Sequence, residues 1–321
     1  MVVNVSIQVK NTDSIEPFFI LVAKGFTPTQ MDILFLIKQQ LARIGINLDV
    51  IKVDMPDGDT TKIRDYDLTI IEFQDYMIDD PFFSDFYREN RSYNLFGYHT
   101  SMDWDEELRT GKNEWFIDNG LQMISNNSQE KITHCWQWQD YLLDNILPCL
   151  PLFTKSENKS TFQVLAFNLR EIRPVIGSKA SCPGNINKTV GLAVRKAIAY
   201  AVNREEIRRV VLGDEYEITH HPTNPAMSEW LNPSSIQYCY NLRAAKGFLQ
   251  SAGFDMGWYP CVNYPTPDYS YSRPWLNWES YCSNETIAET SVNSGISIIV
   301  ISNFIPVFLI FTRVRNRKKT S

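Results

Sequence analysis

Three carboxylates lie within one short stretch of the chain, "QDYMIDDP" at residues 74–81: Asp75, Asp79 and Asp80. Neighbouring carboxylates can share acid and base roles in catalysis, but that chemistry needs a positioned partner group. The sequence provides no such partner nearby, which favours recognition of a cation or a solvated polar loop. These three residues are the first candidates for a binding site.

Two other stretches carry residue types that bind metals. His220 and His221 are adjacent and precede Pro222, and an imidazole pair can bind a soft divalent ion. A solvated loop pair is the interpretation that we favour. Residues 54–60, "DMPDGDT", resemble a calcium loop only superficially, because the twelve-residue ligand pattern is absent. We predict no metal site and no cofactor.

Catalytic motifs with a defined spacing are absent from the sequence. It contains no GxSxG, HExxH, GxxxxGK[ST] or GxGxxG pattern, and it has only four histidines. We therefore predict that the protein is not an enzyme.

The first 155 residues alternate between predicted strands and helices. Residues 17–25 form an apolar strand, and Thr27, Pro28 and Gln30 have the spacing of a helix start with a capping box. Residues 46–53 alternate as a second strand should. Strand, helix and strand with short connections predict a parallel βαβ unit and an α/β fold.

A buried helix is predicted in the stretch 190–213, "VGLAVRKAIAYAVNREEIRRVVLG". Asn203 interrupts it and is placed to cap a second helix, with Glu206 three residues later. Asn241 begins another helix in the same way, and Gly253 ends it. A further long helix is predicted over 128–146.

Composition excludes one class of protein and leaves others open. The net charge of −6 and the pI near 5.4 argue against a nucleic-acid-binding protein. Aromatic residues make up 13% of the chain, which suits either core packing or the lining of a binding cleft. A length of 321 residues predicts two domains or one large domain.

Six cysteines occur without CxxC spacing, so a zinc site built from them is not predicted. Their even number is compatible with disulfides or with free thiols, and both alternatives stay open. If the chain is external, local spacing suggests the pairs Cys135–Cys149 and Cys239–Cys261.

The C-terminal end has the pattern of a membrane anchor. Residues 294–312, "SGISIIVISNFIPVFLIFT", are uncharged and apolar, and five Lys or Arg residues follow them. At about 1.5 Å per residue a helix of this length spans roughly 28 Å, close to the bilayer core. The positive-inside rule then places the C-terminus in the cytoplasm and the bulk of the chain outside. No export signal is visible at the start, so we expect an upstream segment.

An ordered set of motifs resembles extracellular solute-binding proteins of ABC importers, family 5. The set includes "IKQQLARIGINLDVIKVD", "RDYDLTIIEF", "DDPFFSDFY", "WQDYLLDNILPCLPLF", "AVRKAIAYAVNREEIRRVVLGDEYEI" and "YCYNLRAAKGFLQSAGF". The resemblance covers roughly residues 28–254. In the family's usual order the AVRKAIAYAVN block comes before the others, whereas here it follows them. We interpret the chain as the C-terminal portion of an enlarged, archaeal-type member.

The resemblance implies a periplasmic-binding-protein-like (type II) fold with two lobes, of which this chain is taken to be the C-terminal portion. The apolar segment described above adds a predicted C-terminal transmembrane helix. It also implies a receptor that binds oligopeptides or dipeptides for uptake, although sugar and nickel binders belong to the same family. Asp75 matches the carboxylate that pairs with a peptide's terminal ammonium, and Asp79 or Asp80 are the alternatives. Tyr98 and Trp104 are the expected wall residues.

The expected organisation and partners follow from these assignments. We predict an α/β lobe (1–155), the helical AVRKAIAYAVN block (156–254), a linker (255–291), a transmembrane helix (292–313) and a basic cytoplasmic tail (314–321). The expected partners are a peptide or other small solute, ABC permease and ATPase subunits and the membrane, with no nucleic acid. The competing hypothesis is a membrane-tethered surface ectodomain for sensing or adhesion, without transport.

Overall fold

A strand, a helix and a second strand open the described chain: β1 (Phe19–Gly25), α1 (Pro28–Ala42) and β2 (Ile46–Lys52). The two strands are paired in parallel over their full length. The helix begins with a capping box: Thr27 Oγ1 accepts the Gln30 N–H at 3.2 Å, and Gln30 Oε1 accepts the Thr27 N–H at 3.3 Å. The predicted βαβ unit and its capping residues are therefore confirmed.

The computed structural model describes residues 19–53, 66–73, 81–83, 85–91, 94–123, 129–157, 161–183 and 185–254. These residues fall within one compact unit, Met1–Ser270. A second unit, Tyr271–Ser321, lies wholly outside the described residues.

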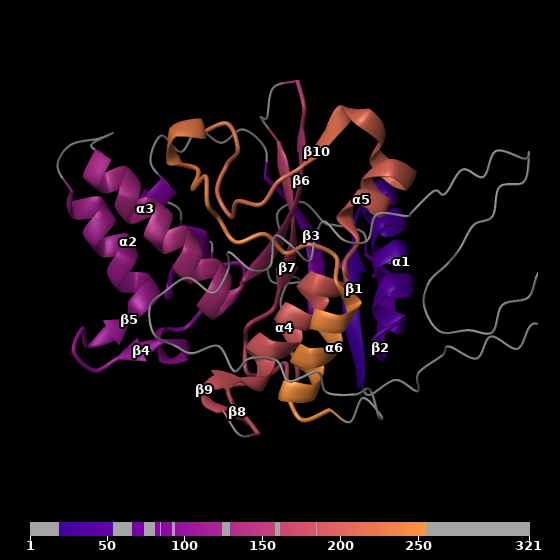
Figure 1. Cartoon of the computed structure of the whole chain (residues 1–321), viewed down its shortest axis with the longest axis horizontal. Helices are drawn as coiled ribbons and strands as arrows, with labels where there is room; N and C mark the ends of the chain where they lie inside the picture. The colour runs from indigo at the N-terminus through magenta and orange to yellow at the C-terminus, as the bar shows by residue number, and fades with distance from the viewer. Residues whose placement is uncertain are drawn as a thin grey trace, which may run out of the picture. The chain divides into compact units, whose positions relative to one another are not determined.

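One mixed sheet organises the described unit, in the strand order β10-β6-β7-β3-β1-β2 (Figure 1). Its other strands are β3 (Leu68–Phe73), β6 (Cys149–Lys155), β7 (Phe162–Phe167) and β10 (Tyr216–Ile218). Strand β1 pairs in parallel with both β2 and β3, whereas β7, β6 and β10 join by antiparallel pairs. The α/β class that the sequence predicts is confirmed.

Helices cover both faces of this sheet. Every residue of β7 and all but the last residue of β6 are buried, which requires cover on both sides. Helix α1 lies on one side, and α2 (Lys112–Gln122) and α3 (Gln129–Tyr141) lie on the other (Figure 1). Helix α3 continues as a π-helical turn, Leu142–Ile146, so the helix predicted over 128–146 is confirmed.

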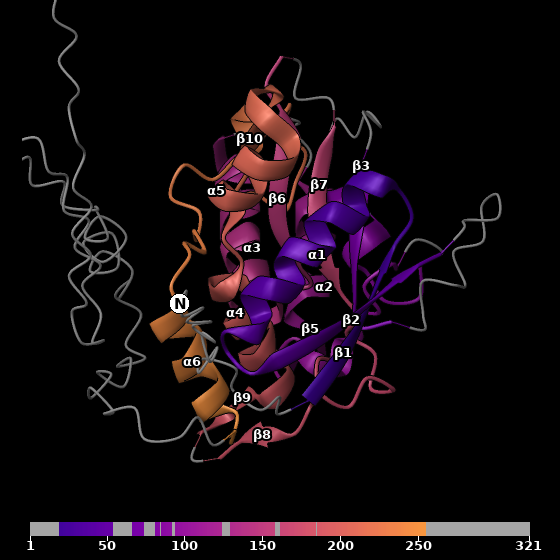
Figure 2. The same cartoon turned by 90° about the vertical axis from the view of Figure 1, so that its right-hand side faces the viewer.

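Three helices form the block after β7: α4 (Val190–Ala201), α5 (Arg204–Ile207) and α6 (Leu242–Ser251). Helices α4 and α6 lie side by side in both ribbon views (Figures 1 and 2). Asn203 Oδ1 accepts the Glu206 N–H at 3.1 Å, and Asn241 Oδ1 accepts the Ala244 N–H at 2.9 Å. Both predicted asparagine caps are confirmed.

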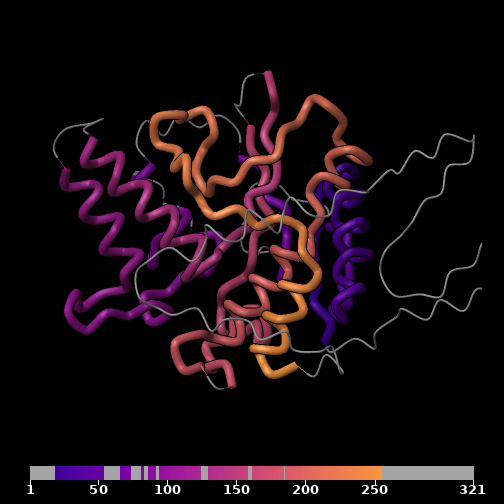
Figure 3. The backbone as a smooth tube through the Cα atoms, viewed as in Figure 1, coloured from indigo at the N-terminus to yellow at the C-terminus, as the bar shows by residue number. Residues whose placement is uncertain are grey.

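Short elements complete the described chain. Two small hairpins are formed by β4 (Trp104–Asp105) with β5 (Thr110–Gly111), and by β8 (Ser181–Cys182) with β9 (Asn185–Thr189). The 3-10 turns and the second π-helical turn are Pro81–Phe83, Asp85–Tyr87, Thr100–Met102, Arg208–Leu212, Gly213–Glu215 and Ser228–Trp230. After β10 the backbone crosses to α3 and returns to α6 (Figure 3). Gln139 Nε2 of α3 holds this crossing by donating to Trp230 O at 2.6 Å.

The predicted division into an α/β lobe (1–155) and a helical block (156–254) stays a prediction. The boundary between residues 155 and 156 falls in the connection of the β6–β7 hairpin, and the segments on its two sides contribute strands to the same sheet. The predicted linker, transmembrane helix and tail begin at residue 255 and lie outside the described residues. A second lobe stays a prediction.

Candidate functional site

The acidic stretch "QDYMIDDP" follows the carboxyl end of β3. Its carboxylates Asp75, Asp79 and Asp80 lie outside the described residues, as does the stretch 54–60. Phe73 is the last described residue before it and stacks on Phe162 at 4.8 Å between ring centroids. The ligand role of the three carboxylates therefore stays a prediction.

Tyr98, predicted as a wall residue, lies in the core with 2% of its surface exposed. Its hydroxyl donates to Asp103 Oδ1 at 2.7 Å. Burial and the neighbouring Asp103 charge raise the pKa of Tyr98 well above its ordinary value. In this structure Tyr98 positions Asp103 and presents almost no surface to a solute, so its ligand role stays a prediction.

Asp103 is the residue that organises this region, and the sequence argument missed it. Its carboxylate also accepts the backbone N–H of Asn113 at 2.8 Å and the hydroxyl of Tyr141 at 3.0 Å. Burial raises the pKa of Asp103, while the hydrogen bonds from Tyr98, Asn113 and Tyr141 act in the opposite direction. The partners are 5, 10 and 38 residues away along the chain, so no local spacing pattern reveals them.

Trp104, the second predicted wall residue, follows Asp103 directly and has 50% of its surface exposed. It pairs with Gly111 in the β4–β5 hairpin. The backbone carbonyl of Asp103 accepts the Lys112 N–H at 3.0 Å, so the residue before Trp104 is held at the start of α2. A fixed backbone with an exposed indole suits a contact residue, and that role stays a prediction.

Strand β3 runs from the region of the Tyr98 segment to Phe73, the last described residue before the acidic stretch. Its amino end, Leu68, pairs with the last residue of β7. Two residues beyond β7, the Leu169 N–H donates to Phe96 O at 2.8 Å, which places the Tyr98 segment near that end. The acidic stretch instead follows Phe73 at the other end, and a strand of six residues spans roughly 17 Å. Tyr98 and Trp104 are brought together, and the start of the acidic stretch lies at the opposite end of β3.

Two buried arginines fix the block around α4 and α5. Arg195, 1% exposed, donates from Nε and Nη2 to Ile146 O at 3.2 and 2.8 Å and from Nη1 to Ile176 O at 2.5 Å. Burial lowers the pKa of Arg195 to about 9, so it remains charged at neutral pH. Among the described residues it forms no ion pair, and backbone carbonyls take the place of a carboxylate.

Arg204 fixes the segment after β10 in the same way, by donating hydrogen bonds to backbone carbonyls. It donates to Pro151 O and Thr219 O at 2.8 Å, to Tyr238 O at 2.9 Å and to His220 Nδ1 at 3.1 Å. Burial lowers the pKa of Arg204 to about 10. Burial and the Arg204 charge lower the pKa of His220 to about 3, so its imidazole is neutral and accepts the bond.

The prediction of a solvated histidine pair at residues 220 and 221 is therefore wrong. Both side chains are partly buried, and His220 belongs to the Arg204 network. Within the described ranges no group of three or more His, Cys, Asp or Glu residues is arranged to hold a metal ion.

Comparison with known proteins gives the context for this geometry. Residues 122–277 match the family model of Bacterial extracellular solute-binding proteins, family 5 Middle. This segment, just under half of the chain, is similar to the solute-binding proteins of family 5. No curated protein and no solved structure matches the chain.

The family 5 segment begins at the end of α2 and runs through α6 into residues outside the described chain. It therefore contains both buried arginines and the carbonyl groups that they bind. Residues 28–121 precede the matched segment, and for them the resemblance rests on the motifs alone. Tyr98, Asp103 and Trp104 belong to this preceding part.

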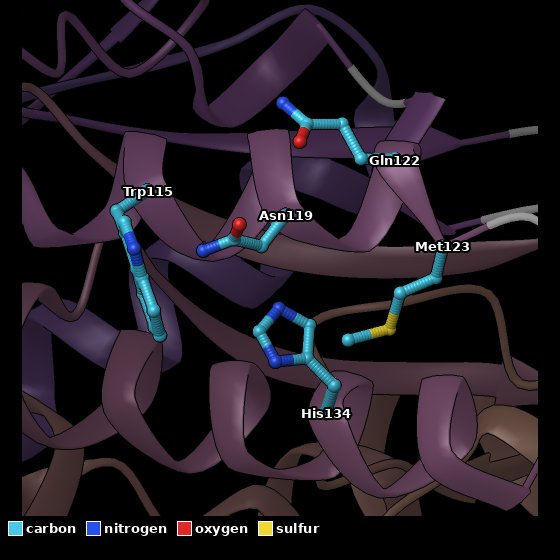
Figure 4. A pocket seen from close by; sticks show the side chains of 5 residues that line it. All are labelled: Trp115, Asn119, Gln122, Met123 and His134. Atoms are coloured by element: carbon cyan, nitrogen blue, oxygen red, sulfur yellow. The ribbon is translucent and has the colours of Figure 1, made fainter.

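A shallow pocket lies between α2 and α3, with a volume of about 350 Å³ (Figure 4). Its lining residues are uncharged or weakly basic: Trp115, Asn119, Gln122, Met123 and His134. The ring of His134 lies between Trp115 and Met123, and its Nε2–H donates to Phe116 O at 2.8 Å. The lining suits a small uncharged group, and the sequence argument did not single out any of these residues.

The described cysteines do not form the predicted pair. Cys135 and Cys149 are both free and buried. Cys135 Sγ accepts Gln139 Nε2–H at 3.2 Å, and Cys149 Sγ lies 3.8 Å from the Tyr87 hydroxyl. The Cys135–Cys149 disulfide is therefore wrong. Cys182 and Cys239 are also free, and Cys261 lies outside the described residues.

None of the helices described here is both long enough and apolar enough to cross a membrane. The segment 294–312, for which the sequence predicts such a helix, lies outside the described residues.

Proposed function

We propose that this chain is the solute-binding receptor of an ABC importer and that its ligand is a short peptide. The observation that carries the proposal is the family 5 match over residues 122–277. The partners on this proposal are the permease and ATPase subunits of the importer. The same proposal assigns no catalytic role to the acidic stretch.

Within this proposal, Asp75 pairs with the terminal ammonium of the peptide, and Asp79 or Asp80 are the alternative carboxylates. A carboxylate and an ammonium attract strongly where water is excluded. Trp104 supplies an aromatic surface, which its 50% exposure allows.

The ligand is tested by thermal shift on the full chain in detergent, with dipeptides, longer peptides, sugars and Ni²⁺ as probes. A ligand that binds only the folded state raises the melting temperature with its concentration. Asp75→Asn should weaken binding of a free-amine peptide more than binding of its acetylated form. Asp49→Asn, an exposed carboxylate on the edge strand β2, is the matched control.

Equal losses for the free and acetylated peptides would remove Asp75 from the site. A higher melting temperature with sugars or Ni²⁺, and no change with peptides, would show that the ligand is a sugar or a metal ion and not a peptide. No shift with any probe would favour the tethered ectodomain without transport.

We also propose that residues 295–312 anchor the receptor in the membrane, with the C-terminus in the cytoplasm. The uncharged segment and the five basic residues after it support this orientation. Truncation after Asn293 should move the protein from the membrane fraction to the soluble fraction. Protease added to intact cells should digest the N-terminal region. Full-length protein recovered in the cytosolic fraction without detergent would contradict this topology.

A further inference from the structure

A chain of hydrogen bonds links the side chains of Glu89, His99 and Ser101. Glu89 Oε1 lies 2.9 Å from His99 Nε2, and His99 Nδ1 lies 2.8 Å from Ser101 Oγ. This is the arrangement of an activated nucleophile: the hydroxyl is the nucleophile, the imidazole is its base, and the carboxylate orients the base. Lys179 extends the chain, because its Nζ donates to Ser101 Oγ at 2.5 Å.

The protonation of the imidazole follows from its partners. A carboxylate oxygen only accepts, so the proton between Glu89 and His99 is carried by Nε2. In this tautomer the Nδ1 lone pair faces both the Ser101 hydroxyl and the Ser101 N–H. Burial opposes ionisation of Glu89, but hydrogen bonds from Thr100 and the charge of Lys179 lower its pKa overall. Glu89 is therefore ionised at neutral pH and fixes this tautomer.

The backbone holds the three groups in register. Glu89 Oε2 accepts the Thr100 N–H at 2.8 Å, so one carboxylate binds both the ring and the turn after it. His99 also caps this turn, since its Nδ1 accepts the Ser101 N–H at 3.1 Å. A helix cap of this kind needs only the hydrogen bond from the Ser101 N–H to His99 Nδ1. The carboxylate on Nε2 and the ammonium on the hydroxyl are additional, and both favour ionisation of Ser101.

The cluster is open to solvent. Ser101 is exposed, and the side chain of His99 has 57% of its surface exposed. Trp104, three residues after Ser101 along the chain, is half exposed. The Lys179 ammonium also pairs with Glu171 Oε1 at 2.5 Å, so its positive charge is held beside the Ser101 hydroxyl.

We propose that Ser101 is a nucleophile that accepts an acyl group from small carboxylic esters, with His99 as its base and Glu89 as the orienting carboxylate. The Ser101 Oγ bonds to the ester carbonyl carbon while its proton passes to His99 Nδ1. The bond from that carbon to the alcohol oxygen then breaks, and the proton leaves with the alcohol. Water, activated by His99, releases the acid and restores the hydroxyl. Glu89, His99, Ser101 and Lys179 are not among the residues proposed to bind the solute, so this activity can be tested separately from solute binding.

The test uses the full chain in detergent with p-nitrophenyl acetate as the probe, followed by mapping of acetylated peptides. We expect an initial release of nitrophenolate and an acetyl group on Ser101. Ser101→Ala should abolish both without changing the melting temperature, since its side chain is exposed. His99→Gln should slow acetylation by about 100-fold, and Lys179→Met should give a smaller loss. Ser251→Ala is the matched control, because this exposed hydroxyl donates to the helix carbonyl of Phe248 and accepts or donates no hydrogen bond with an imidazole of the described residues.

Three outcomes would overturn the proposal. One is acetylation of Ser101 no faster than that of Ser251. Another is a Ser101 adduct whose rate does not change in His99→Gln. The third is an acetyl group on Lys179 with none on Ser101. The peptide thermal shift should be the same in Ser101→Ala and the native chain, so failure here leaves the solute-binding proposal unaffected.

Discussion

In both the α4–α5 region and the segment 94–104, a charged side chain binds free backbone groups at the end of a helix. The charge is positive in the first region and negative in the second. In the first, Arg195 donates to Ile146 O, the carbonyl of the last residue in the π-helical turn after α3. In the second, Asp103 accepts the N–H of Asn113 in the first turn of α2. Helix ends leave carbonyls free at one end and N–H groups free at the other, and the helix dipole favours a cation and an anion respectively. The charge of each buried group matches the backbone groups that need partners.

The two regions differ in how easily their charges can be removed. The pKa values of Arg195 and Arg204, about 9 and 10, keep both guanidiniums charged at neutral pH. Each also makes several bonds from one rigid planar group, which a lysine cannot reproduce. Asp103 spreads its bonds over two tyrosine hydroxyls and one N–H, so single changes remove them one at a time. We therefore expect larger effects from the arginines.

The largest expected effect is that of Arg204→Met. The change leaves three carbonyls and the His220 nitrogen without their donor, in a region where Arg204 is 5% exposed. Removing one partner from a buried polar network costs about 3–5 kcal/mol in the free energy of unfolding. Denaturant unfolding of the full chain in detergent measures it.

Arg208→Met is the matched control for that change. Arg208 pairs with Glu205 at 3.2 Å on the surface, and such pairs contribute about 0–1 kcal/mol. Equal losses for Arg204→Met and Arg208→Met would contradict the role assigned to the buried network.

Asp103→Asn should cost less, about 1–3 kcal/mol. The amide keeps one acceptor oxygen but replaces the other by an NH2 group, so one of the three donors loses its partner. Tyr98→Phe removes a single bond, and we expect about 1 kcal/mol. If Tyr98→Phe cost as much as Asp103→Asn, the carboxylate would not be the centre of this region.

Local signals in the sequence predict much of this fold. Thr27 with Gln30, and Asn203 with Glu206, are capping pairs three residues apart, and the structure has both. The parallel βαβ unit follows from the same kind of local pattern. Strand order beyond that unit does not, because β7 and β10 take their places through contacts between distant segments. This is why the predicted boundary at residue 155 divides a hairpin.

The site was harder to predict for the same physical reason. Arg195 and Arg204 bind mainly backbone carbonyls, and Asp103 binds one backbone N–H and two distant tyrosine hydroxyls. Every residue has a backbone carbonyl and most have an N–H. Sequence patterns identify carboxylate and imidazole pairs but give no indication of which carbonyl an arginine meets. The adjacent histidines illustrate the consequence: their spacing suggested a surface pair, while Arg204, 16 residues earlier, draws His220 inward.

The pH dependence of the free energy of unfolding tests the Arg204 network, because His220 belongs to that network. Burial and the Arg204 charge place the pKa of His220 at about 3, below its ordinary value of 6.5. Below pH 6.5 the unfolded chain takes up a proton that the folded chain refuses, so stability present above pH 6.5 is lost as the pH falls towards 3. We expect a loss of about 1–2 kcal/mol between pH 7.5 and pH 5.

His220→Gln tests the origin of that loss. The amide oxygen can still accept the bond from Arg204, but the side chain does not titrate. The variant should therefore lose less stability than the native chain between the two pH values. An unchanged difference between pH 7.5 and pH 5 would assign the loss to other groups, His221 first, because burial also lowers its pKa.

The smallest expected effect on stability is that of Trp104→Ala, and it separates fold from function within the Asp103 region. The indole is half exposed, so its removal should change the free energy of unfolding by about 0.5 kcal/mol or less. Its neighbour Asp103 keeps every hydrogen bond, because none involves the Trp104 side chain. If Trp104 contacts the peptide, the thermal shift that the peptide produces should fall while the melting temperature of the free protein stays the same. Tyr98→Phe should show the reverse pattern, with lower stability and an unchanged shift per unit of ligand, because its ring is buried. A peptide response unaltered by Trp104→Ala would remove the β4–β5 hairpin from the solute site and leave the carboxyl end of β3 as its remaining location.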